Sequence, residues 1–229
     1  MGDALATGGV VIRVGPLGLT AAVLTTWGIM LVLTILSWAA SRRLSPHPAP
    51  WQTALEGIVG AAEDAIRSVL PGQAPHIFPF VTTLWIFIVT ANLSGLIPGV
   101  HAPTADLSVA SALAILVFLS VHWFGIRAEG WKQYFRHYLV PMPVLLPFHL
   151  MGEISRTLTL AVRLFGNMMS LEMAALLVLL VAGFLAPVPL LALHIVEALI
   201  QAYIFGMLAL IYIAGAIQTQ HLRSQQDKG

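Results

Sequence analysis

The 229-residue sequence contains no cysteine and few charged residues. Without cysteine the chain cannot form disulfides, thiolate nucleophiles, cysteine-bound zinc sites or iron–sulfur clusters. Charged residues make up only 9% of the chain and hydrophobic residues 58%, with a mean hydropathy of +0.88, so the surface of an ordinary soluble domain cannot be built. The net charge of +1 gives no sign of a surface for nucleic acid. The composition therefore predicts an integral membrane protein.

Long apolar segments predict an all-α fold in a single membrane domain over residues 1–229. Spanning helices are expected at 21–40, 77–100 and 107–126, and a helical hairpin at 147–221. The two helices of that hairpin should be roughly 55 and 50 Å long, against about 30 Å of hydrocarbon, so both should be steeply tilted. This gives about five transmembrane helices. The Gly-rich residues 1–19 are expected to be a loosely structured lead-in.

Residues 51–70 differ from these spans because they are amphipathic. Apolar residues recur at helical spacing, whereas Glu56, Glu63 and Arg67 share the opposite stripe. Such a surface helix can lie on the membrane face or pack against the cytoplasmic side of its own protein, and the sequence leaves both readings open.

Basic residues predict the orientation. Arg42 and Arg43 follow the first span, and Arg127, Lys132 and Arg136 follow the 107–126 span. Since Lys and Arg collect on the cytoplasmic side, both groups place the N-terminus outside and the C-terminus in the cytoplasm.

The 147–221 hairpin carries the charged residues of greatest interest. An arginine within a bilayer costs about 3 to 17 kcal/mol, so Arg163 is a functional-site candidate by default. Arg156, Arg163 and Ser170 are spaced by seven and form one stripe, with Asn167 one turn beyond Arg163. Glu153 can pair with Arg156, which would make both structural. Glu153, Arg156 and Ser170 are therefore structural or inner-path candidates.

Further polar groups gather on the outer side of Arg163. Glu172 lies about 13 Å outward of it along the first long helix, and His194, Glu197 and Gln201 form a polar stripe on the second. This is the arrangement expected of an aqueous half-channel that stops at a charge barrier. Because a guanidinium stays protonated, Arg163 cannot relay a proton but can hold a nearby carboxylate in its ionised form. His122, near the end of the 107–126 span, is interpreted as an interfacial histidine rather than a ligand.

Three motifs resemble subunit a of the F-type ATP synthase. They are Gly152-Glu153-Ile154-Ser155-Arg156, then Arg163-Leu164-Phe165-Gly166-Asn167 with Glu172 beyond, and Gln201-Ala202-Tyr203-Ile204-Phe205. The likeness runs from about residue 51 to 220 and includes Asn92-Leu93-Ser94-Gly95-Leu96-Ile97-Pro98. Thr157, where many members have Pro, and Leu171, at a usually small position, depart from the pattern.

The resemblance implies a non-catalytic stator subunit that conducts H⁺ or Na⁺ through two offset half-channels, without metal or cofactor. Arg163 would face the carboxylates of a rotating c-subunit ring, with Gln201 as its neighbour. Asn167, Glu172 and His194 would belong to the outer access path, whereas Glu197 is included on stripe geometry alone. Expected partners are the c-ring, the b subunits of the peripheral stalk, the other ATP synthase subunits and lipid. The expected location is an energy-coupling membrane, the bacterial inner (plasma) membrane.

Two alternatives remain. An intramembrane metalloenzyme would use His194, Glu197, His149 and Glu153 as ligands, but the sequence has no His-Glu-x-x-His pattern. A free-standing transporter would move its substrate without a partner ring. The choice between H⁺ and Na⁺ cannot be made from this chain, because it depends mainly on the carboxylate site of the ring.

Overall fold

The computed structural model describes residues 10–14, 17–42, 50–97, 100–131, 146–183 and 188–226. Apart from a short hairpin and single turns, these residues are helical. Strands β1 (Val10–Val14) and β2 (Leu17–Thr20) form the hairpin and pair antiparallel. The expectation of a loosely structured lead-in is therefore wrong for these residues. The β-branched Val10, Val11 and Ile12 explain the difference, because such side chains favour extended backbone.

Five helices are long and apolar enough to cross a membrane, and a sixth is amphipathic, which confirms the predicted fold class. The spanning candidates are α1 (Ala21–Arg42), α3 (Ala74–Ser94), α4 (Leu107–Glu129), α6 (Leu146–Ala182) and α7 (Val188–Gln226). The amphipathic helix is α2 (Pro50–Val69). At 1.5 Å per residue, the 37 residues of α6 and the 39 of α7 span about 55 and 58 Å.

Helix α3 begins and ends earlier than the expected 77–100. It starts at Ala74, where Pro75 occupies the first turn and needs no amide hydrogen bond, and it continues through Pro79. It ends at Ser94, and a short 3-10 turn, η1 (Pro103–Ala105), leads into α4. The side chain of Asp106 caps α4 by accepting a hydrogen bond from the Ser108 amide. The described residues of the connection between α3 and α4, 95–97 and 100–106, are therefore folded, and they provide part of the site described below.

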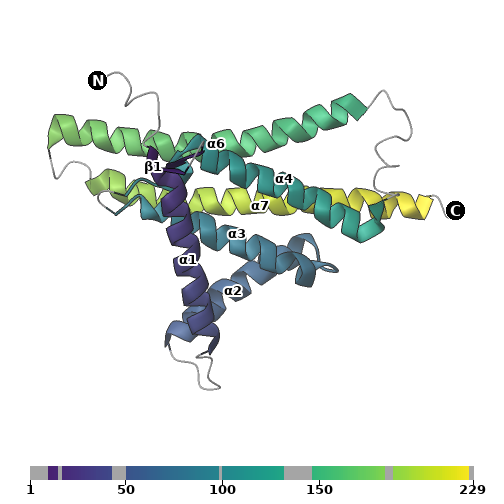
Figure 1. Ribbon diagram of the computed structural model, residues 1–229. Coiled ribbons are helices and arrows are strands. Elements are labelled where there is room, and N and C mark those ends of the chain that lie inside the picture. Colours follow the sequence, from purple (N-terminus) through teal and green to yellow (C-terminus); the bar gives the residue numbers. More distant parts are fainter. Residues whose placement is uncertain are drawn as a thin grey trace.

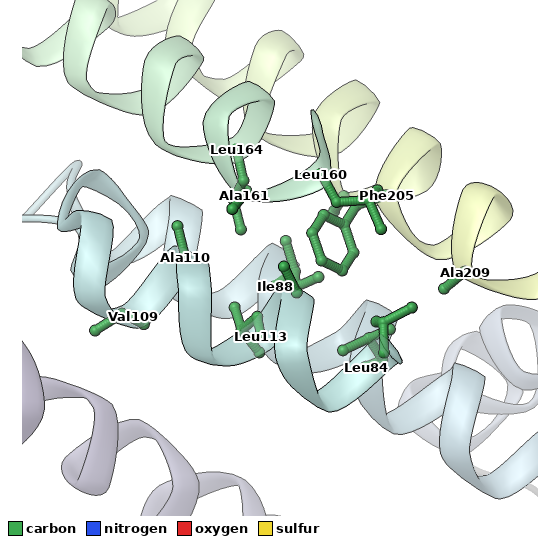
Figure 2. Packing of buried hydrophobic residues seen from close by; sticks show 13 residues of the cluster. Leu84, Ile88, Val109, Ala110, Leu113, Leu160, Ala161, Leu164, Phe205 and Ala209 are labelled. Atoms are coloured by element: carbon green, nitrogen blue, oxygen red, sulfur yellow. The ribbon is translucent and has the colours of Figure 1, made fainter. Parts of the chain in front are cut away.

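The core lies where α3, α4, α6 and α7 meet (Figure 1). Leu84 and Ile88 of α3 pack against residues of the other three helices, including Leu164 of α6 and Phe205 of α7 (Figure 2). Several of the buried residues are alanines, and small side chains allow helix backbones to approach closely in a membrane protein.

Helix α2 combines the two readings that its sequence left open. Its C-terminal half packs against the protein, where Ile66 and Leu70 join a cluster with residues of α3 and α7. In its N-terminal half, Leu55, Ile58 and Val59 remain exposed. The apolar surface of that half is available to lipid headgroups or to a neighbouring subunit.

Helix α1 runs across the long axes of α6 and α7 in Figure 1. Seven of its large apolar side chains are exposed, among them Trp27, Leu31 and Leu36, as expected of a helix surrounded by lipid. If α1 spans the bilayer, helices that lie across it must be inclined to the membrane normal. Their length leads to the same conclusion, because both exceed the hydrocarbon thickness by more than 20 Å.

Candidate functional site

Arg163 lies on an exposed face of α6, and no acid in the described part of the chain forms an ion pair with it. It is 13 residues from the start and 18 from the end of the apolar segment Leu150–Val181, or about 20 and 27 Å along the helix. Val162, next to it, and Leu158, on the preceding turn, are 53% and 62% exposed. The described chain therefore leaves both Arg163 and these nearby apolar side chains uncovered.

Asn167 and Gln201 connect the two long helices one turn beyond Arg163. The Nδ2 amide of Asn167 donates a 2.8 Å hydrogen bond to Oε1 of Gln201. Gln201 is only 1% exposed, and its Nε2 has no hydrogen-bond partner among the described residues. A buried amide donor of this kind is costly to leave without an acceptor.

Glu172 contacts the folded connection between α3 and α4. Its Oε1 accepts a 2.8 Å hydrogen bond from the Ala102 amide, and its Oε2 lies 3.6 Å from Nδ1 of His101. The His101 side chain is 83% exposed and that of Glu172 20%, so the histidine can exchange with solvent while the carboxylate remains held by the backbone. Because Glu172 follows Arg163 by nine residues, it projects from roughly the opposite side of α6.

His194 belongs to a buried network centred on Asn92. The Asn92 side chain is fully buried, accepts a 2.7 Å hydrogen bond from Thr104 Oγ1 and donates a 3.2 Å bond to the Ala198 carbonyl. Nε2 of His194 lies 3.2 Å from the Asn92 carbonyl oxygen. Because a carbonyl can only accept, His194 carries a proton on Nε2. The network ties α7 to α3 and to η1 at the same end as Glu172.

Glu153 lies on the other side of Arg163 and has a partner that the sequence did not suggest. Its Oε2 is 3.1 Å from Nε2 of His122, so the carboxylate joins α6 to α4. The expected pair between Glu153 and Arg156 is wrong: the Arg156 guanidinium lies over the ring of Tyr212, 5.5 Å from its centroid. Residues three apart on a helix are near neighbours, but the crossing helices α4 and α7 offer these side chains other partners.

The other candidate residues take no part in these contacts. Ser170 is exposed and Glu197 half-buried, and neither forms a hydrogen bond or ion pair with the described residues. Of the residues considered as metal ligands, Glu153 pairs with His122 and His194 bonds to Asn92, whereas the side chain of His149 lies outside the described part of the chain. Within the described ranges no three His, Cys, Asp or Glu residues gather as a metal site would require.

Comparison with known proteins identifies the family. The sequence model of the family described as ATP synthase A chain matches residues 23–214. This chain belongs to the ATP synthase A chain family. Among its curated relatives in this family, "ATP synthase subunit a 2" of Pelobacter propionicus is 66% identical over 211 residues, covering 92% of each chain. "ATP synthase subunit a" of Legionella pneumophila (strain Paris) is 60% identical over 215 residues, covering 93% of this chain and 94% of the relative.

The A chain family assignment confirms the resemblance stated from the motifs. It does not test the roles of individual residues. Sequence reasoning missed His101 and Thr104 as partners in the site, and it interpreted His122 as merely interfacial. The signal available for His101 and Thr104 was their place directly after the Asn92-to-Pro98 motif, in a segment of the chain that the sequence reading left unassigned.

Proposed function

We propose that this member of the ATP synthase A chain family is the non-catalytic, ion-conducting stator subunit a of an F-type ATP synthase. It provides two half-channels that carry H⁺ or Na⁺ to and from the carboxylates of a c-subunit ring, and Arg163 separates the two. The observation that carries this proposal is an arginine midway along a spanning helix, exposed next to uncovered apolar side chains and without an ion pair within the described chain.

The energy of that arginine supports a partner at this face. A charge facing hydrocarbon costs about 3 to 17 kcal/mol, so a guanidinium left to lipid would strongly destabilise the fold. A carboxylate on an adjacent subunit removes this cost by forming an ion pair. Because the apolar residues beside Arg163 are also uncovered, the same subunit would bury them.

Polar groups on both sides of Arg163 support two separate access routes. Glu172 lies nine residues after it, about 13 Å along α6, and contacts His101 and the α3–α4 connection. Glu153 lies ten residues before it, about 15 Å in the opposite direction. Neither acid reaches Arg163, so each can serve its own side of the barrier.

The chemistry of the barrier follows from the side chains. A ring carboxylate that approaches Arg163 is held in its ionised form by the permanent positive charge and therefore releases its ion. Each elementary charge that crosses 100 mV releases about 2.3 kcal/mol, and the subunit directs this energy into movement of the ring.

The remaining assignments of the proposal concern partners and membrane. We assign the c-ring to the exposed face that carries Arg163, and we include the b subunits of the peripheral stalk and the other ATP synthase subunits in the complex. The N-terminus lies outside and the C-terminus in the cytoplasm, because basic residues follow α1 and α4. The bacterial relatives support the inner (plasma) membrane as the location.

The test is Arg163→Ala in the complete ATP synthase, reconstituted in liposomes. Ion-driven ATP synthesis should fall below detection, because nothing then forces the ring carboxylate to release its ion. Arg67→Ala is the matched control, since it removes an exposed arginine whose Nε contacts Glu63 on the surface of α2 at 2.9 Å. It should synthesise ATP at the wild-type rate. ATP synthesis that survives Arg163→Ala would contradict the proposed role.

A further inference from the structure

The pair formed by His122 and Glu153 is a titratable site within the spanning helices that the proposed barrier does not require. His122 lies seven residues before the end of α4, about 10 Å along the helix, and Glu153 lies near the start of α6. Their side chains are 26% and 21% exposed, so the protein encloses most of the pair but leaves part of it accessible. It occupies the side of Arg163 opposite to Glu172.

The hydrogen bonds of His122 fix how many protons the pair holds. Nδ1 lies 2.9 Å from the Phe118 carbonyl oxygen, which can only accept, so Nδ1 carries a proton. Nε2 and the Glu153 oxygen are 3.1 Å apart, and two lone pairs at that distance would repel. One proton must therefore lie between them, on the nitrogen of an imidazolium or on the oxygen of a carboxylic acid. Both states keep the same heavy-atom contact.

Each helix packed around the pair carries a charged or titratable residue toward this end of the bundle. On α6, the Arg156 guanidinium lies over the ring of Tyr212, and on α4 Arg127 follows His122 by five residues and is exposed. On α7, His221 and Arg223 follow Tyr212. On α3, His76 is exposed at the first turn. Glu153 forms its ion pair across the helices with His122.

We infer that His122 and Glu153 form a proton relay on the cytoplasmic side of Arg163. The inference rests on the proposed function, which it deepens by naming a relay residue on α4. A proton leaving the ring binds Glu153, the shared proton moves fully to Nε2 of His122, and His122 releases a proton to cytoplasmic water. One proton enters, one leaves, and the pair returns to its starting state.

The test compares the wild type with three variants. Each complex is assembled in full, stripped of its catalytic head and reconstituted in liposomes. The variant His122→Gln/Glu153→Gln keeps a hydrogen bond between α4 and α6 but holds no transferable proton. The swapped variant His122→Glu/Glu153→His restores the same chemistry in reverse. His76→Gln, an exposed histidine outside the pair, is the control. Proton entry driven by a potassium diffusion potential is followed with an internal pH dye, in sodium-free buffer and again with added Na⁺.

The double-glutamine variant should lose at least about tenfold in proton flux, because it removes general acid–base transfer while keeping the contact. The swapped variant should recover most of the proton flux. If the pair were merely structural, flux would not require an acid–base pair at these two positions. His76→Gln should match the wild type. Wild-type flux in the double-glutamine variant, an assembled swapped variant that does not conduct, or a wild type that carries Na⁺ and not protons would overturn the relay. If the double-glutamine chain does not assemble, the swapped variant alone decides.

The relay and the proposed function can fail separately. Arg163→Ala is measured beside these variants by ATP synthesis in the complete complex. Retained synthesis there contradicts the barrier, whatever the pair does. Lost synthesis in Arg163→Ala with wild-type flux in the double-glutamine variant leaves the barrier in place and removes only His122 and Glu153 from the path.

Discussion

The close approach of α3 to α7 at Gly206 leads to a prediction that the structure makes quantitative. A Cβ atom added at Gly206 would lie 1.7 Å from Nε1, 2.1 Å from Cδ1 and 2.6 Å from Cε2 of Trp85. The indole ring is stacked on Tyr203, with ring centroids 6.1 Å apart, and its Nε1 donates to the Tyr203 carbonyl at 3.4 Å. Trp85 must therefore move if Gly206 becomes alanine.

The expected cost combines three effects. Overpacking in a tight core costs about 1–3 kcal/mol, and loss of the aromatic stack adds about 0.5–1.5 kcal/mol. Alanine regains about 0.5–1 kcal/mol over glycine within a helix. Gly206→Ala should thus lower the free energy of unfolding by about 0.5–4 kcal/mol. Gly206 follows Gln201 by five residues, so the displacement also reaches the helix that carries the site.

The assay is unfolding of the purified chain in mild detergent by titration with sodium dodecyl sulfate, followed by tryptophan fluorescence. Gly215→Ala is the control on the same helix, because nothing lies within 4 Å of a Cβ added there, and it should be as stable as the wild type or slightly more so. Trp85→Leu provides the decisive background. If the clash with the indole is the cause, Gly206→Ala should destabilise this background much less, and an equal loss in both backgrounds would refute the reasoning.

Two further predictions concern the ion path and α2. Glu172→Ala should lower the free energy of unfolding by about 1–3 kcal/mol because the buried Ala102 amide loses its acceptor. Glu172→Gln keeps an acceptor, so its stability should be close to that of the wild type while ion flux is still slowed. Equal stability of the two variants in the detergent titration would contradict the contact. Ile66→Ala should lower the free energy of unfolding by about 2–5 kcal/mol because Ile66 is fully buried. Ile58→Ala, at a side chain that is 58% exposed, should lower it by less than about 0.5 kcal/mol. Similar losses of stability for both variants in the same titration would mean that α2 packs differently.

The spanning helices and the family could be predicted from the sequence because both depend on local signals. A run of about 20 apolar residues suffices to recognise a span, and the motif from Arg163 to Asn167 with Gln201 some 35 residues later identifies the family without any knowledge of packing. The spacing also placed Asn167 on nearly the same face of its helix as Arg163. The hydrogen bond that joins Asn167 to Gln201 is consistent with that reading.

The partners of the polar residues could not be predicted, because they depend on how each helix is rotated about its axis. In a soluble helix the apolar stripe marks the buried face, but here both the lipid-facing and the buried faces are apolar. Leu158 is 62% exposed and Leu160 only 1%, although both are leucines of α6. Without the rotation of α4 and α6, His122 could not be matched to Glu153.

The neutral character of the hydrogen bond between Asn167 and Gln201 has a consequence for how the two long helices stay aligned. Neither amide gains or loses a proton at any physiological pH, and neither carries a net charge on which the membrane potential could act. In the proposed mechanism, the acids on either side of Arg163 would change their ionisation with every ion that passes. The alignment of α6 with α7 beside Arg163 would then not depend on ion passage, and the gap presented to each arriving carboxylate would stay constant through the cycle.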